Sequence, residues 1–239
     1  MGSINIPESV KQGIEQVKQG KLVLIYDAED REGETDFVIP ASSVTPNEVA
    51  YFRNTAGGLI CIAIHPIAAE KLGLPLVSDI LINVNDNFAF LRRLVEGEGD
   101  LSYDKRSSFS LWVNHRDTFT GITDIDRALT LRKIGEAVYK VLNGDDNTYN
   151  FHTEFRTPGH VSILRAADRL VDERRGQTEL SVALALLAGI SPAMVICEML
   201  DSETGGALNK TNAKAFASER GIIFIEGKEI IAAFHAFLR

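Results

Sequence analysis

The chain is poor in the residues and segments that mark secreted or membrane proteins. It has only two cysteines in 239 residues. Cys61 and Cys197 each lie inside an apolar run, so we expect two buried thiols rather than a disulfide scaffold. No apolar run reaches the roughly 18 residues of a membrane span, and the polar first residues lack the apolar core of a signal peptide. The sequence therefore predicts a cytoplasmic protein without a membrane segment.

An excess of positive charge is also absent, because the formal net charge is -8. An acidic surface repels a phosphate backbone, so nucleic acid is not an expected partner. A small anionic substrate would require a local cluster of Arg or Lys within this acidic molecule.

Repeats, low-complexity tracts and linkers rich in Pro, Gly or Ser are missing, so residues 1–239 are expected to form one domain. Short apolar runs typical of buried strands alternate with segments of helical periodicity. This alternation predicts a layered α/β or α+β domain with helices covering a sheet. Strands are expected at 21–26, 37–41, 59–64, 108–115, 160–164, 193–200 and 222–225.

Helices are expected where apolar residues recur at helical spacing between start and stop signals. Thr45-Pro46-Asn47-Glu48 has the form of a capping box with proline at the first helical position. The polar stretch 144–155 is expected to be a surface loop. The expected helices are 8–19, 46–56, 124–142, 180–187, 212–220 and 229–238.

The densest charge cluster is the stretch Asp27–Asp36, in which six of ten residues are carboxylates. Carboxylates this close repel one another unless a cation lies among them or some are protonated. A hard cation such as Mg²⁺ accepts carboxylates, water and substrate oxygens as ligands. A solvated acidic loop would show the same pattern.

Two further residues are chemically unusual in their surroundings. His160 follows Pro158-Gly159 at the start of an expected strand, where a fixed imidazole could act as a general acid or base. Glu198 lies in an apolar run, where a carboxylate is costly to bury unless it is paired or functional. A structural histidine, and a strand end that faces solvent, are the alternatives.

The stretch Arg174–Glu179 precedes an apolar helix and reads Arg-Arg-Gly-Gln-Thr-Glu. Free N–H groups at a helix N-terminus favour an anion, and arginine adds bidentate donors. Arg174, Arg175, Gly176 and Thr178 therefore form a candidate phosphate site, although an ordinary helix start would look similar.

Together these stretches resemble the 3,4-dihydroxy-2-butanone-4-phosphate synthase family, which converts D-ribulose 5-phosphate to L-3,4-dihydroxy-2-butanone 4-phosphate and formate in riboflavin biosynthesis. The resemblance covers roughly residues 8–235 and is greatest to the single-domain archaeal form. The matching segments occur in the family's order and are 30–36, 57–61, 120–128, 158–160, 174–179 and 196–198.

The resemblance implies a role for each motif residue. Glu32 would be a metal ligand, while His160 and Glu198 match the family's essential pair. The catalytic residues would be His160, Glu198, Glu34, Asp36, Cys61 and Asp27. The substrate would be bound by Arg31, Glu32, Asp36, Arg174, Arg175, Gly176, Gln177 and Thr178. For Cys61, a small buried hydrophobe is the alternative.

The same resemblance implies the rest of the biochemistry. The enzyme would be a lyase that uses Mg²⁺ or Mn²⁺ as a Lewis acid to stabilise an enediolate. It would act on a small-molecule sugar phosphate as a homodimer with its site near the subunit boundary. The fold would be α/β (α+β), a three-layer sandwich in which helices flank a mixed sheet.

The sequence departs from the family at one metal-binding position. The family motif is Gly-His-Thr-Glu, and Gln177 stands where its histidine binds the metal. A glutamine offers a neutral carbonyl oxygen, which Mg²⁺ accepts, but no imidazole nitrogen. One alternative is therefore an impaired variant or paralogue that binds ribulose 5-phosphate without efficient turnover. A protein-interaction module with an acidic surface is another alternative.

Overall fold

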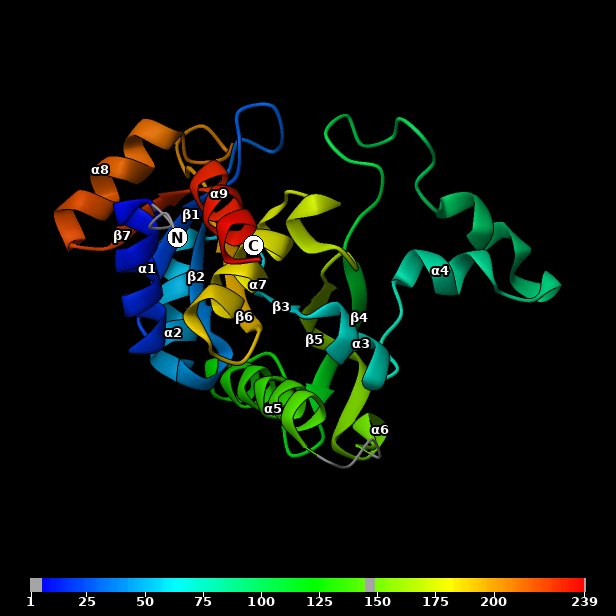
Figure 1. Ribbon diagram of the computed structural model, residues 1–239. Helices are drawn as coiled ribbons and strands as arrows, with labels where there is room; N and C mark the ends of the chain where they lie inside the picture. Colours follow the sequence, from blue (N-terminus) through cyan, green and yellow to red (C-terminus); the bar gives the residue numbers. More distant parts are fainter. Residues whose placement is uncertain (1–5, 145–148, 239) are drawn as a thin grey trace.

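The computed structural model describes residues 6–144 and 149–238, and its centre is a seven-stranded mixed sheet. The strand order is β4-β5-β3-β6-β2-β1-β7 (Figure 1). Pairs β1–β7 and β3–β5 are parallel, and the other neighbours are antiparallel. The strands are β1 (Val23–Tyr26), β2 (Thr35–Pro40), β3 (Cys61–Ile64), β4 (Phe109–His115), β5 (Phe155–Arg165), β6 (Ala193–Glu198) and β7 (Ile223–Glu226).

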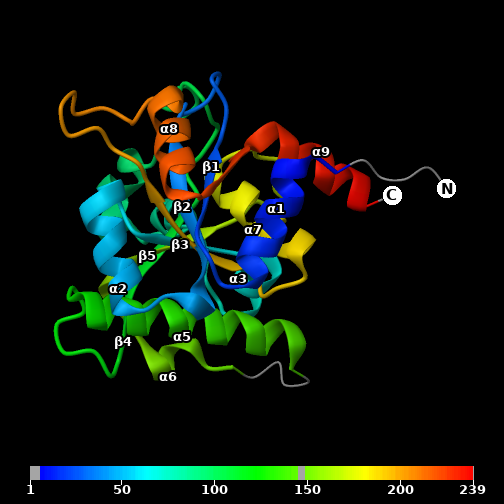
Figure 2. The ribbon, with the colours of Figure 1, turned by 90° about the vertical axis from the view of Figure 1, so that its left-hand side faces the viewer.

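Helices cover both faces of the sheet (Figure 2). One face packs against α1 (Glu8–Lys18), α7 (Gln177–Ala188) and α9 (Gly227–Phe237). The opposite face packs against α2 (Pro46–Tyr51), α3 (Pro66–Lys71), α5 (Asp124–Asn143) and α8 (Lys210–Arg220). This is the predicted three-layer arrangement. Within the described residues, no helix is both long and apolar enough to cross a membrane.

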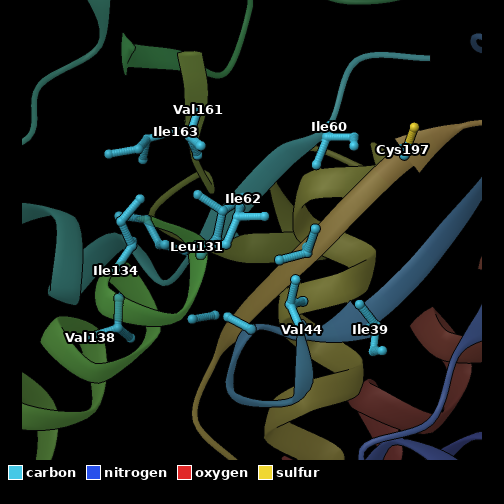
Figure 3. Packing of buried hydrophobic residues seen from close by; sticks show 14 of the residues in the cluster. Ile39, Val44, Ile60, Ile62, Leu131, Ile134, Val138, Val161, Ile163 and Cys197 are labelled. Atoms are coloured by element: carbon cyan, nitrogen blue, oxygen red, sulfur yellow. The ribbon is translucent and has the colours of Figure 1, made fainter. Parts of the chain in front are cut away.

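The two cores follow from the alternation of side chains along buried strands. In β3, Cys61 belongs to the core beneath α7, whereas Ile62 belongs to the core beneath α5. Figure 3 shows Ile62 directed towards Leu131 and Ile134 of α5. Because β3 is buried on both faces, its sequence reads as a continuous apolar run rather than as an alternation.

The helix ends agree with the local sequence signals. Thr45 Oγ1 accepts a hydrogen bond from the Asn47 N–H at 3.2 Å, and the Glu48 carboxylate accepts one from the Thr45 N–H at 2.8 Å. The predicted capping box is therefore confirmed. Helix α7 begins at Gln177, three residues before the expected start at 180, and ends at Gly189, whose φ is +66°.

Two segments differ from the expectations or were left unassigned. Within the loop expected at 144–155, the structure has α6 (Phe151–Glu154), and residues 145–148 lie outside the described part. The ring of Phe151 stacks on Phe155 at 4.1 Å between centroids, a packing contact that the polar composition of the segment conceals. Shorter turns of 3-10 or π helix lie at Ala41–Ser43, Phe52–Ala56, Asp86–Leu94 and Leu170–Asp172.

Residues 76–107, which we call the arm, stand out from the side of the sheet between α3 and β4 (Figure 1). The arm contains α4 (Val77–Ile82) and the 3-10 turns of Asp86–Leu94. None of its residues is buried. The arm therefore belongs to neither core, and its sequence carries no periodic apolar pattern that would have identified it.

We expect Thr45→Ala to lower the free energy of unfolding by about 1 kcal/mol, because it removes the oxygen that caps α2. Urea unfolding followed by circular dichroism would measure this change. The control is Thr211→Ala, at an exposed position in α8 where alanine favours the helix. Equal losses in the two variants would contradict the capping argument.

Candidate active site

An acidic cavity of about 370 Å³ opens at one end of the sheet, beside the N-terminus of α7. Across the β2–β6 pair, Asp36 lies directly opposite Glu198. Across β3–β6, Cys61 lies opposite Ile196, two residues before Glu198, so their side chains share the α7 face of the sheet. The residues that could take part in chemistry here are Glu32, Asp36, Cys61, Glu96, Tyr103, Arg174, Gln177, Thr178 and Glu198.

Asp27 shapes the acidic loop and does not line this cavity. Its carboxylate is buried and accepts hydrogen bonds from the backbone N–H groups of Glu32 at 3.1 Å and Glu34 at 3.0 Å. Gly33 lies between those two residues with φ +69°, a conformation that favours glycine. Asp27 thus fixes the backbone of the loop that carries Glu32 and Glu34, and its predicted catalytic role stays a prediction.

Burial and mutual repulsion alter the protonation of the neighbouring carboxyl groups. Burial, followed by the charges of Glu32 and Glu198, raises the pKa of Glu34 to about 7. Burial, followed by Glu198 and Glu34, raises the pKa of Asp36 well above its usual range. Burial likewise raises the pKa of Glu32, although Arg31 opposes the shift. Asp36 and Glu32, which line the cavity, therefore retain their protons more readily than ordinary carboxyl groups, while Glu34, which does not line it, can exchange a proton near neutral pH.

Glu198 is held by the backbone of the turn before β3. Its Oε2 accepts a hydrogen bond from the Leu59 N–H at 2.8 Å. A Cβ at Gly58 would lie 2.6 Å from the carbonyl oxygen of Glu198 and closer still to Oε2, so this approach requires glycine. Burial, followed by the charge of Glu198, raises the pKa of the Cys61 thiol well above its usual range, so Cys61 is a neutral wall of the cavity.

Gln177, the first residue of α7, is buried, and its amide has a fixed orientation. Nε2 donates to the carbonyl oxygens of Ile25 at 3.0 Å and Glu34 at 3.1 Å. Both partners are acceptors, so the NH₂ group must face them. Within the part of the chain that the structure describes, Oε1 is buried without a hydrogen-bond partner, and Gln177 lines the cavity. This oxygen is available to a hard cation.

A cation in this cavity would not be held by a standard cluster of ligands. Among residues 6–144 and 149–238, no group of three or more His, Cys, Asp or Glu side chains is arranged to bind a metal. The two predicted ligands, Glu32 and Gln177, offer one carboxylate and one amide oxygen on the same cavity wall. Oxygen donors completed by water or substrate are typical of Mg²⁺.

Two arginines meet over the N-terminus of α7. Arg174 Nη1 lies 2.7 Å from the fully buried carboxylate of Glu179, and Arg31 Nη2 lies 2.9 Å from Asp104. Arg174 Nε donates to the same oxygen of Asp104. A Cβ at Gly176 would lie 2.8 Å from Arg31 Nη1 and nearer still to Arg174, so glycine is needed here. The structure thus adds Arg31 to the predicted phosphate site.

Two features of this cluster were not expected from the sequence. Arg175 is exposed and does not line the acidic cavity, unlike Arg174 and Thr178. Asp104 belongs to the arm and was not singled out, because an isolated aspartate between Tyr103 and Lys105 matches no motif. Its pairing with Arg31 and Arg174 spans 70 or more positions of sequence, which no local signal reveals.

His160 lies on β5, outside the lining of the acidic cavity. Its N–H donates to Asn114 Oδ1 at 2.9 Å, and its Nδ1 lies 3.1 Å from Asn114 Nδ2. When the β3–β5 register is extended by two residues, His160 lies beside Leu59 and therefore two strands from Glu198. Strand spacing makes this separation about 10 Å between backbones. The predicted pair shares one end of the sheet.

The motif 120–128 positions the partner of His160. The carboxylate of Asp126 accepts hydrogen bonds from the N–H groups of Thr120 at 3.1 Å and Gly121 at 2.8 Å. Gly121 has φ +93°, and a side chain there would collide with the Asn114 amide. The motif therefore shapes a turn that supports Asn114, which in turn fixes the imidazole.

Comparisons with known proteins agree over nearly the whole chain. A family model described as 3,4-dihydroxy-2-butanone 4-phosphate synthase matches residues 11–233. The protein of that name from Archaeoglobus fulgidus is 57% identical over 227 residues, which cover 95% of this chain and 94% of that one. The corresponding protein from Methanosarcina acetivorans is 54% identical over 227 residues, with coverages of 95% and 91%.

A solved structure also has a similar fold. It is a 3,4-dihydroxy-2-butanone 4-phosphate synthase in complex with two magnesium ions, with a TM-score of 0.73 and 29% sequence identity. The match covers 95% of this chain and 96% of that chain.

The raised pKa of Glu34 predicts a pH-dependent stability. Between the usual value of 4.5 and about 7, the folded protein keeps a proton that the unfolded chain has lost. The free energy of unfolding should therefore fall as the pH rises through this window. Glu34→Gln should make the decline smaller, as measured by urea unfolding in EDTA at several pH values. Exposed Glu29→Gln is the control, and equal slopes in wild type and Glu34→Gln would refute the assignment.

Proposed function

The chain belongs to the 3,4-dihydroxy-2-butanone 4-phosphate synthase family, and from this premise we propose that it converts D-ribulose 5-phosphate to L-3,4-dihydroxy-2-butanone 4-phosphate and formate. The product is a precursor in riboflavin biosynthesis, and the loss of a one-carbon fragment makes the enzyme a lyase. The observation that carries the proposal is an acidic cavity beside a pair of arginines. The substrate has the matching polarity, with hydroxyl groups at one end and a phosphate at the other. The near-full-length identity of 57% gives no support to the alternative of an impaired protein.

In this proposal the phosphate lies at the N-terminus of α7. Arg174 and Arg31 supply charged donors, and Thr178 lies in the first turn of the helix, where N–H groups are free. Gly176 lets the guanidinium groups of Arg31 and Arg174 lie close to the backbone at the start of the helix. Arg175 is exposed, so it is less suited than Arg174 to a direct contact with the phosphate.

In this proposal the carboxyl groups of the site and the imidazole of His160 transfer the protons. Glu34 has a pKa of about 7, so it can exchange a proton with a sugar hydroxyl or carbon near neutral pH, and the pKa of Asp36 is also raised by burial and by Glu198. Glu198 accepts a backbone N–H through Oε2, which fixes the direction of its other oxygen. His160 is oriented by Asn114 at the same end of the sheet.

A divalent cation, Mg²⁺ or Mn²⁺, fits the residues present. Glu32 would supply a carboxylate, and Gln177 would supply the unpartnered Oε1 that its two N–H hydrogen bonds direct away from β1. Both are oxygen donors of the kind these ions prefer. When bound, the ion would supply Lewis-acid stabilisation of negative charge on the substrate.

We further propose that the enzyme is a cytoplasmic homodimer. Exposed apolar side chains follow β4 at Phe119, Ile122 and Ile125, and Phe119 is 94% exposed. Their turn contacts Asn114, the partner of His160. A second subunit covering this surface would bury these side chains and bring its own groups towards His160. A phosphorylated substrate, which does not cross membranes unaided, is consistent with a cytoplasmic location.

Formate release from ribulose 5-phosphate tests the reaction and its metal requirement. We expect turnover that is lost after EDTA treatment and restored by Mg²⁺ or Mn²⁺. Glu32→Gln should abolish turnover while the melting temperature stays close to that of wild type, because Glu32 is a loop residue outside both cores. Glu29→Gln, in the same loop but exposed, should remain active. Full activity in EDTA would refute the metal requirement.

The role of His160 is tested by His160→Asn, which keeps a polar side chain but cannot transfer a proton. We expect turnover to fall by about 10²–10⁴-fold while substrate affinity is nearly preserved. The control is His152→Asn, at an exposed position in α6. Steady-state formate release and calorimetric binding would separate the two quantities. A variant with normal turnover would remove His160 from the reaction.

A further inference from the structure

We propose that Asp104 is a built-in anion that occupies the phosphate position between Arg31 and Arg174 and leaves it when a phosphate group binds. One oxygen of its carboxylate contacts both guanidinium groups, Arg31 Nη2 at 2.9 Å and Arg174 Nε. All three side chains are at least 86% buried. The identity of the natural ligand as a sugar phosphate rests on the proposed function, whereas the exchange of anions rests on these contacts.

The two guanidinium groups make their close contacts with Asp104 and Glu179, and a third carboxylate lies further away. Asp104 contacts both arginines and Glu179 contacts Arg174, while Glu32 Oε1 lies 4.0 Å from Arg31 Nη2. Glu179 is fully buried, and its second oxygen accepts the Ala167 N–H at 2.9 Å, so this carboxylate is a permanent part of the core. If Asp104 left without replacement, Arg31 would be left with the more distant Glu32 and Arg174 with Glu179, so both nearly buried guanidinium groups would lose their shared close acceptor, which is costly. An incoming anion removes that cost.

Asp104 differs from Glu179 because it belongs to the arm, residues 76–107. No apolar side chain of the arm is buried, so little apolar contact holds the arm in place. Its other side-chain hydrogen bonds and ion pairs stay within the arm or its base, for example Arg106 with Asp79. Asp104 forms the ion pairs that join the arm to Arg31 and Arg174, and the ring of Tyr103 beside it lies 5.8 Å from the Arg31 guanidinium carbon. The arm can therefore withdraw Asp104 by breaking one cluster of contacts.

The arginine pair also has unused capacity for a larger anion. Arg31 Nη1 is buried and has no hydrogen-bond partner among the described residues while Asp104 is in place. A carboxylate has two oxygens, whereas a phosphate group offers three to an arginine pair, so phosphate can satisfy this spare donor. Because Gly176 has no side chain, the Nη1 atoms of Arg31 and Arg174 can lie close to the backbone at the start of α7. The site is thus built for an anion with more acceptors than Asp104 supplies.

The exchange has a measurable consequence, because an internal competitor weakens the binding of the external ligand. Asp104→Asn keeps the size of the side chain but removes its charge. We expect this variant to bind inorganic phosphate about 10-fold more tightly than wild type, the order of one charge-assisted contact. Its KM for ribulose 5-phosphate should fall by a similar factor. The matched control is Asp79→Asn, which removes an arm carboxylate paired only with Arg106 and should leave both quantities unchanged.

Isothermal titration with inorganic phosphate on the wild-type, Asp104→Asn and Asp79→Asn proteins gives the decisive comparison. Unchanged or weaker phosphate binding by Asp104→Asn would overturn the proposal, because Asp104 would then be a fixed support for Arg174. Asp104→Ser provides a second uncharged variant should the first prove unstable. We expect Asp104→Ser to bind phosphate more tightly than wild type as well. If the folded Asp104→Ser protein shows no gain in phosphate affinity, that result also counts against the proposal.

Failure of this inference can be told apart from failure of the proposed function. Tighter phosphate binding by Asp104→Asn, together with no formate release by wild type, would support the anion exchange and refute the reaction. Formate release by wild type, with no gain in phosphate affinity in the variants, would support the reaction and refute the exchange.

Discussion

Electrostatic repulsion among carboxyl groups at one end of the sheet is the constraint on which the site depends. The pairing of β2 with β6 fixes Asp36 opposite Glu198, and the loop anchored by Asp27 returns Glu32 and Glu34 to the same place. The chain cannot move these groups apart without breaking the sheet. The repulsion must therefore be relieved by protons, by a cation or by nearby arginines. The raised pKa values of Glu34 and Asp36 show that protons relieve part of the repulsion. The proposed metal would supply the cation, and Arg31 and Arg174 oppose the rise that burial causes in the pKa of the nearby Glu32.

This constraint also connects Gln177 with the acidic loop. Gln177 donates to the carbonyl oxygen of Glu34 and to that of Ile25 on β1, so one side chain joins the start of α7 to the acidic loop and to the apolar strand that precedes it. A neutral ligand adds no further charge to a crowded site. In the family motif an imidazole stands at this position, and an amide oxygen in its place keeps the preference for hard cations.

Much of the fold could be predicted from local signals, whereas the contacts that complete the site could not. The capping box at Thr45, the apolar strand Cys61–Ile64 and the helix Asp124–Asn143 follow from patterns within a few residues, and the structure confirms them. The motifs located the acidic cavity because its residues lie in short conspicuous stretches. Asp104 was not predicted as a site residue because its partners are distant in sequence. Arg175 was predicted together with Arg174 because spacing cannot show which of two adjacent arginines points inward.

The arm has a consequence for the thermodynamics of the whole chain. The steepness with which denaturant unfolds a protein, and its heat capacity of unfolding, both scale with the surface that becomes exposed. Residues 76–107 bury no apolar side chain in the native state, so they add length without adding to that surface in proportion. The protein should consequently unfold with the cooperativity of a shorter chain. Changes in the length of the arm away from Asp104 should alter its reach far more than the stability of the two cores.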